Sequence, residues 1–138
     1  MWILYAFLSA VFSALVAILS KMGLQGINSN YGTAIRTTVV LVVSWLFVGA
    51  AKMRGVELNL DRKQFLYLLL SGLATGGAWL CYNKALQLGP TTRVASIDKL
   101  SIVLIAIISY LLLGENMNWL SALGVAFIAF GTIVLVWS

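Results

Sequence analysis

Histidine is absent from this chain, cysteine occurs once, and charged residues make up only 9% of it. With so few candidate ligands, we expect no metal centre. A nucleophile would lack a histidine base, so only a Ser–Lys pair of Ser96 with Lys99 stays open. No phosphate-binding loop of the form Gly-x-x-x-x-Gly-Lys-Ser/Thr occurs. We therefore predict a protein that is neither an enzyme nor driven directly by ATP, with no cofactor and no nucleic-acid partner.

Apolar residues fill most of the 138 positions: the chain is 62% hydrophobic, and its mean hydropathy is +1.01. Five stretches approach the roughly 20 helical residues needed to cross a bilayer core of about 30 Å. They cover residues 2–22, 31–51, 64–88, 92–113 and 118–137. Because these runs are continuous rather than alternating, they indicate helices. We predict an all-α integral membrane protein, with one domain over residues 1–138, in a bacterial-type cytoplasmic membrane.

Local chemistry marks the predicted helix ends. Gly23 and Gly89 follow the first and third stretches, where a glycine suits the left-handed position after a helix. Asn28 begins a run of three capping residues before the second stretch. Asp61 and Gln64 have the spacing of a capping box before the third. The connections are therefore short and leave no room for an inserted soluble domain.

Cationic residues near the helix ends are divided almost evenly between the two sides of the membrane. One side has Lys52, Arg54, Arg62 and Lys63. The other side has Lys21, Lys84 and Arg93. Because cytoplasmic loops are enriched in Lys and Arg, four against three favours a cytoplasmic N-terminus, but only by one charge. Both a single orientation and dual topology, with chains inserted both ways, remain open.

Three charged residues lie deeper, where a charge is costly and faces protein or a wet cavity. Arg36 is in the second stretch, and Asp98 and Lys99 are in the fourth. Asp98 is interpreted either as an ion-pair partner of Arg36 or Lys84, or as a proton-coupling carboxylate. Because neighbours on a continuous helix point about 100° apart, we expect Asp98 and Lys99 not to neutralise each other.

Polar side chains gather on the half of the membrane that contains these charges. A vestibule rich in cations suits an anionic or zwitterionic solute. The predicted substrate contacts are Arg36, Lys99, Asn83, Lys84 and Tyr82, and the predicted coupling residue is Asp98, which could instead set the geometry of the cations. Trp79 could line the same space, but a packing or interfacial role is more typical of such a tryptophan.

Several motifs together resemble the EamA repeat of the drug/metabolite transporter superfamily. They include Y-N-K-A-L-Q-L-G-P-T-T from Tyr82, Gly114-Glu115 after the fourth stretch, and the glycine-rich fifth stretch. The resemblance covers essentially the whole chain. It implies a five-helix unit, of which typical members carry two in inverted orientation, and a role in secondary transport or export of metabolites. Glu115 matches a family element at a helix end, which implies a structural role.

This chain holds a single repeat, so the resemblance implies an antiparallel homodimer of ten helices with a site near the midplane. The small multidrug resistance relatives use an acidic residue in the first helix to export lipophilic cations. This chain has Ser13-Ala14 there, so the resemblance does not imply cation export for it. We expect a transporter of a small polar or anionic metabolite, whose partners are a second copy, the bilayer and the solute. The alternatives are a non-transporting accessory or assembly subunit and a lipid-phosphate flippase.

Overall fold

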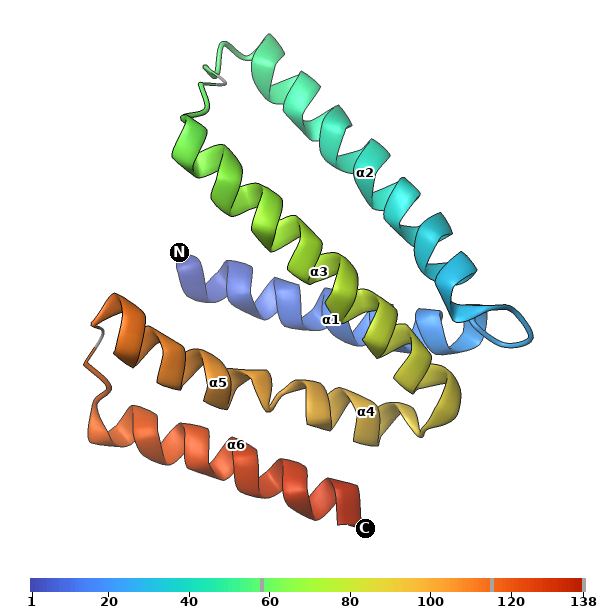
Figure 1. The fold of residues 1–138 in the computed structure, drawn as a ribbon, viewed down its shortest axis with the longest axis vertical. Coiled ribbons are helices and arrows are strands. Elements are labelled where there is room, and N and C mark those ends of the chain that lie inside the picture. The colour runs from blue at the N-terminus through green and yellow to red at the C-terminus, as the bar shows by residue number, and fades with distance from the viewer. Residues whose placement is uncertain (58, 115, 138) are drawn as a thin grey trace. The chain divides into compact units, whose positions relative to one another are not determined.

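The computed structural model describes residues 1–57, 59–114 and 116–137, and all the secondary structure in these ranges is helical (Figure 1). The helices are α1 (Trp2–Gly23), α2 (Ser29–Met53), α3 (Arg62–Leu88), α4 (Thr91–Asp98), α5 (Ser101–Ile108), the π-helix η1 (Ser109–Leu113) and α6 (Trp119–Trp137). Five helical segments are long and apolar enough to cross a membrane, with α4, α5 and η1 together forming the fourth. The predicted all-α class with five membrane spans is confirmed.

The chain divides into two compact units. One unit comprises Met1–Leu19 together with Leu88 and the residues after it, and the other comprises Ser20–Gln87. In the first unit, α6 packs against α4 and α5. The second unit contains the end of α1, all of α2 and nearly all of α3.

Seven hydroxyl groups in the described part of the spans find a partner within their own helices. Each donates to the carbonyl oxygen four residues earlier; the residues are Thr33, Thr37, Thr38, Ser44, Thr75, Ser96 and Thr132. Lipid offers no hydrogen-bond partner, so this local bonding lets a polar residue remain on a spanning helix.

Two of the predicted caps are present. Asn28 is the N-cap of α2, and its side chain accepts a hydrogen bond from the backbone N–H of Asn30 at 2.9 Å. Gln64 Oε1 accepts from the backbone N–H of Asp61 at 3.0 Å, which is half of the expected capping box.

The predicted left-handed glycines are wrong. Gly23 is the last residue of α1, because the helical bonding continues one residue beyond it: the Leu24 N–H donates to Ser20 O at 2.9 Å. The left-handed turn falls on Gly26, with φ +75°. Gly89 does not have a positive φ either, and Pro90, with φ −63°, is the N-cap of α4.

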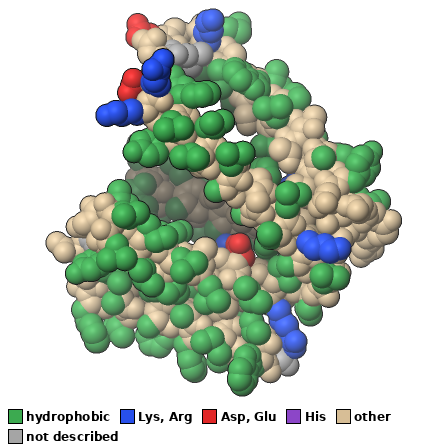
Figure 2. Space-filling view, in the orientation of Figure 1, with side chains coloured by type: hydrophobic (Ala, Val, Ile, Leu, Met, Phe, Trp, Pro, Cys, Tyr) green, Lys and Arg blue, Asp and Glu red, His purple; other side chains and the backbone are tan. Residues whose placement is uncertain are grey.

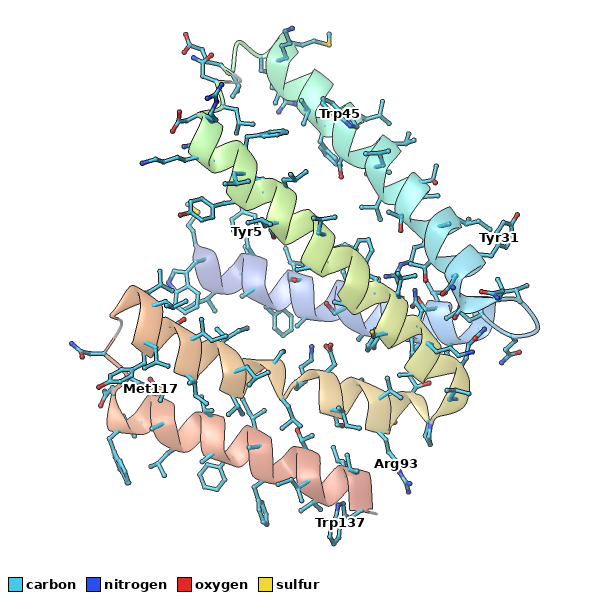
Figure 3. All side chains as sticks on the ribbon, viewed as in Figure 1. Tyr5, Tyr31, Trp45, Arg93, Met117 and Trp137 are labelled. Atoms are coloured by element: carbon cyan, nitrogen blue, oxygen red, sulfur yellow. The ribbon has the colours of Figure 1, made fainter. Side chains whose placement is uncertain are left out.

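Large apolar side chains are exposed along every span, among them Phe47 (74%) and Leu112 (81%). Figure 2 shows hydrophobic side chains widely spread over the visible face, with one group of charged side chains at the α2–α3 connection and a few others elsewhere. Tyr31 near the start of α2 and Trp137 at the end of α6 point outward (Figure 3), as interfacial aromatic residues do. These surfaces are suited to lipid.

The fourth span is not the continuous helix predicted over 92–113. Lys99 and Leu100 form a turn between α4 and α5 (Figure 1). Across it the N–H groups reach back three residues instead of four: Lys99 to Ser96 O and Ile102 to Lys99 O, both at 3.0 Å. No proline or glycine lies here. The Thr132 hydroxyl of α6 lies 3.2 Å from Ser96 O, so a side chain from another helix contacts the backbone hydrogen bonds of α4 at this break.

Candidate functional site

A polar cluster in the Ser20–Gln87 unit is centred on Arg36, about 10 Å along α2 from its first residue. Arg36 Nη1 donates to Ser20 Oγ at 2.9 Å and to Asn83 Oδ1 at 3.4 Å. The guanidinium carbon lies 4.9 Å from the centre of the Trp79 ring, within range of a cation–π interaction. Residues from α1, α2 and α3 therefore hold one cation.

Asn83 is oriented by a second set of hydrogen bonds. Its Nδ2 donates to Thr33 Oγ1 at 2.7 Å, and the Thr33 hydroxyl donates to Ser29 O at 2.8 Å. Because that hydroxyl has already given its hydrogen to a carbonyl, it can only accept from Asn83. The amide nitrogen must therefore face Thr33 and the amide oxygen must face Arg36.

The inner part of the cluster is closed to solvent. Asn83 is 1% exposed and Thr33 is 5% exposed, whereas Arg36 is only half-buried. Among the described residues of the Ser20–Gln87 unit, Arg36 donates hydrogen bonds through Nη1 alone and forms no ion pair. Within this unit, the guanidinium is thus held in place by neutral groups and not by a carboxylate.

Next to the cluster, the α1–α2 connection is tied to the end of α3. Lys21 Nζ donates to Leu86 O. Gln87 Nε2 donates to Leu24 O at 2.9 Å and to Ile27 O at 2.6 Å. An open cavity of about 250 Å³ lies here, lined by Lys21, Leu24, Gln25, Gly26 and Gln87.

Three further predicted contacts can be placed on α3. Asn83 contacts Arg36 but is too buried to touch a solute in this conformation. Tyr82 is half-buried and precedes Asn83 on α3. Lys84 is exposed.

Asp98 and Lys99 form an ion pair in the other unit, with 3.6 Å between Lys99 Nζ and Asp98 Oδ2. Each side chain is about half exposed, 55% for Lys99 and 51% for Asp98. The expectation that these neighbours would not neutralise each other is wrong. It assumed a continuous helix, whereas the pair lies where α4 ends at the turn of Lys99 and Leu100, and the long, flexible Lys99 side chain brings Nζ to the neighbouring carboxylate.

Sequence reasoning did not find three residues of the Arg36 cluster: Ser20, Thr33 and Trp79 were not assigned to it. A signal was present for two of them. Thr33 and Arg36 are three apart on α2, and Trp79 and Asn83 are four apart on α3, so each pair shares a helix face. Ser20 has no cluster residue three or four positions away on its own helix, so the sequence contained no such signal for it. Among the described residues, no group of three or more His, Cys, Asp or Glu side chains could hold a metal ion.

Five membrane-length helices and a cation held within a span define a multi-pass membrane protein of the cell membrane. A family model for EamA-like transporters matches residues 1–137. The chain belongs to the EamA-like transporter family. It is also 48% identical over 134 residues, 97% of this chain and 95% of the relative, to a Sinorhizobium protein named "Uncharacterized transporter in cobO 3'region". No solved structure matches the chain. The family element at Glu115 lies outside the described residues.

Proposed function

We propose that this transporter moves a small polar or anionic metabolite by secondary transport, and that it works as an antiparallel homodimer. The observation that carries the substrate class is Arg36, a cation within a span that has hydrogen-bond partners but no counter-ion among the described residues of its own unit, Ser20–Gln87. An anionic solute would supply the missing charge.

A charge within a spanning helix is costly. An arginine at the helix centre costs on the order of 3 kcal/mol on insertion scales, and the cost at Arg36, closer to the start of α2, is smaller. Ser20 and Asn83 offset the cost of leaving donors unsatisfied, but they bring no negative charge. A structural arginine would be stabilised more strongly by a carboxylate, whereas an arginine that binds a transported anion must keep its charge available.

The dimer is supported by the single repeat and by the exposed apolar faces of all spans. An inverted second copy would rebuild the paired repeats of two-repeat transporters and provide walls for a permeation route. In this proposal Lys99 binds a second charge of the solute or takes part in coupling. Asp98 is the proposed coupling group.

The test is solute flux by the purified protein in liposomes, with radiolabelled amino acids and dicarboxylates as probes. We expect uptake of at least one anionic or zwitterionic probe and a loss of roughly tenfold or more in Arg36→Gln, because a charged hydrogen-bonding group is removed. Arg54→Gln, which removes the same charge at the end of α2, is the matched control and retains flux. If the wild-type chain alone moves none of the probes, the accessory-subunit alternative replaces this proposal.

A further inference from the structure

The guanidinium of Arg36 has two edges, and the structure commits only one nitrogen of it to the protein. Both contacts are made by Nη1, to Ser20 Oγ and Asn83 Oδ1. Among the described residues of the Ser20–Gln87 unit, none accepts a hydrogen bond from the opposite edge, formed by Nε and Nη2. That edge presents two parallel N–H groups, the arrangement that matches two oxygens on one atom, as in a carboxylate or phosphate.

The direction of this edge is set by groups that cannot themselves reach a ligand. Asn83 is 1% exposed, and its amide is held by Thr33, whose hydroxyl is held by Ser29 O. Trp79 restricts the plane of the guanidinium from one face. An arginine side chain would otherwise lose rotational freedom when it binds an anion, and a guanidinium fixed in advance avoids much of that entropic cost.

We propose that Thr33 and Asn83 are positioning residues, which fix Arg36 so that its Nε–Nη2 edge binds an oxyanion through two oxygens of a carboxylate or phosphate group. This inference rests on the proposed function and specifies its ligand chemistry. It also gives Asn83 a different role from direct contact with the solute.

The decisive variant is Asn83→Asp. The substitution replaces the amide next to Arg36 Nη1 with a carboxylate of almost the same shape, which then competes with any external anion. The Thr33 hydroxyl can turn to donate to the new oxygen, so folding is retained. The matched control is Asn118→Asp, at the exposed position before α6, where the Asn118 carbonyl starts the helix bonding and Asp is an equally good N-cap.

Binding is measured on the full chain in detergent, as the shift of the melting temperature with sodium acetate, sodium phosphate or sodium chloride at equal ionic strength. A ligand that prefers the folded form raises this temperature. We expect acetate or phosphate to protect the wild type and Asn118→Asp more than chloride does. Asn83→Asp should lose this protection, with at least a tenfold weaker apparent affinity. Comparison with Asn118→Asp at the same salt removes the general stabilisation that phosphate gives to folded proteins.

Two further variants separate positioning from simple structural support. Arg36→Lys keeps the charge but lacks the planar fork, so it should bind chloride as well as acetate. Thr33→Val removes the acceptor that orients Asn83 and should weaken oxyanion protection, whereas Thr33→Ser keeps the acceptor and should restore it. If Asn83→Asp cannot be purified in a folded state, the comparison of Thr33→Val with Thr33→Ser tests the positioning role.

Equal protection of the wild type by chloride, undiminished oxyanion protection in Asn83→Asp, or equal behaviour of Thr33→Val and Thr33→Ser would each overturn the inference.

Micelles doped with phosphatidic acid distinguish a lipid head group from a free anion as the ligand. Protection by the lipid alone, again lost in Asn83→Asp, supports the site and assigns it to a lipid head group. The readout is binding and not flux. An inactive protein with an intact oxyanion site therefore rejects the proposed function alone, and anion flux that is insensitive to Asn83→Asp rejects this inference alone.

Discussion

An arginine on a spanning helix is tolerated when protein groups satisfy its donors, and Arg36 obtains such groups from helices far apart in the chain. Ser20 is 16 positions away and Asn83 is 47 positions away. A lysine here would be a more compact, strongly hydrated charge and could not use the Trp79 face and the side-chain oxygens at the same time. The neighbouring residues therefore select arginine specifically.

Asp98 illustrates the opposite arrangement, a charge whose partner is its own neighbour. Its contact with Lys99 leaves a net neutral pair, which costs less in an apolar setting than two separate charges. A group that couples transport to protons must be able to lose such a partner when it takes up a proton. The pair is thus compatible with Asp98 as a structural ion-pair partner and with Asp98 as a proton-coupling carboxylate. Replacing Asp98 with a neutral residue has a different effect on transport in the two cases.

If Asp98 couples transport to protons, Asp98→Asn should lose uptake driven by an imposed pH gradient while keeping solute exchange at equal pH on both sides. The physical reason is that an amide cannot change its charge as a proton binds. Both modes of flux are measured in the same liposomes. Asp61→Asn, which removes an exposed carboxylate before α3, is the control and keeps both modes. Unchanged gradient-driven uptake in Asp98→Asn would assign Asp98 to the ion pair alone.

At the scale of elements, the break between α4 and α5 depends on α6. Thr132 is 4% exposed and contacts both Ile128 O at 2.9 Å and Ser96 O at 3.2 Å. In a continuous helix Ser96 O would accept from the N–H of Leu100, which here donates to Ile97 O instead. Ser96 O accepts instead from the Lys99 N–H at 3.0 Å, and the Thr132 hydroxyl, whose single hydrogen is shared with Ile128 O, is a second donor beside it.

Thr132→Val should therefore lower the free energy of unfolding by about 0.6–1.7 kcal/mol, the range for hydrogen bonds between membrane helices. Thr132→Ser keeps the hydroxyl and should cost less. Thr38→Val is the matched control, because Thr38 is exposed and bonds only to Ala34 O in its own helix. The measurement is reversible unfolding in mixed micelles. A Thr132→Val cost no larger than that of Thr38→Val would contradict the role given to this contact.

A second element-level feature is the packing of the α1–α2 connection on α2. A Cβ at Gly32 would lie 2.5 Å from Leu24 Cδ2 and 3.3 Å from Ile27 Cδ1, and Leu24 is buried. A side chain at position 32 therefore fits only if the Leu24 side chain shifts.

Gly32→Ala should destabilise the protein by about 1–3 kcal/mol, because the buried Leu24 side chain must move. Gly49→Ala in the same helix meets no atom within 4 Å and should be neutral or slightly stabilising. Melting temperatures of the two variants check the difference. Equal changes in melting temperature for the two variants would show that the Leu24 side chain can move aside without destabilising the protein.

At the scale of the whole molecule, the apolar surface and the balanced loop charges are compatible with the proposed antiparallel dimer. Every span exposes large hydrophobic side chains, which lipid or a second copy can cover. Because opposite orientations of one sequence require nearly equal Lys and Arg counts on the two sides, four against three permits an antiparallel pair.

Charge variants should separate the two orientations. Substituting Gln for Arg54, Arg62 and Lys63 lowers the cationic count of their side from four to one. Asn59→Lys with Arg93→Gln raises that count to five and lowers the other to two. We expect terminal tags to report a single, opposite orientation for each variant, low flux for either alone, and restored flux when both are produced in the same cells. Full flux from one uniformly oriented variant would rule out the antiparallel dimer.

The sequence predicted the fold better than the site. The span boundaries agree with the helices to within about two residues, and Asn28 and Gln64 act at helix ends as expected. Arg36 and Asn83 were both selected, and they do meet. The sequence named Trp79 only as a less favoured lining residue. The partner Ser20, the pairing of Asp98 with Lys99 and the break in the fourth span were missed, because each depends on a contact or a turn that composition does not encode.

Segment hydropathy by itself determined that this chain crosses a membrane five times, because the free energy of transfer into lipid is a sum over residues in each stretch. The direction of the Asn83 amide, the free edge of Arg36 and the entry of Thr132 into the ladder of α4 were decided only by tertiary structure. A hydrogen bond requires two groups within about 3 Å, and only the packed helices bring residues tens of positions apart to that distance.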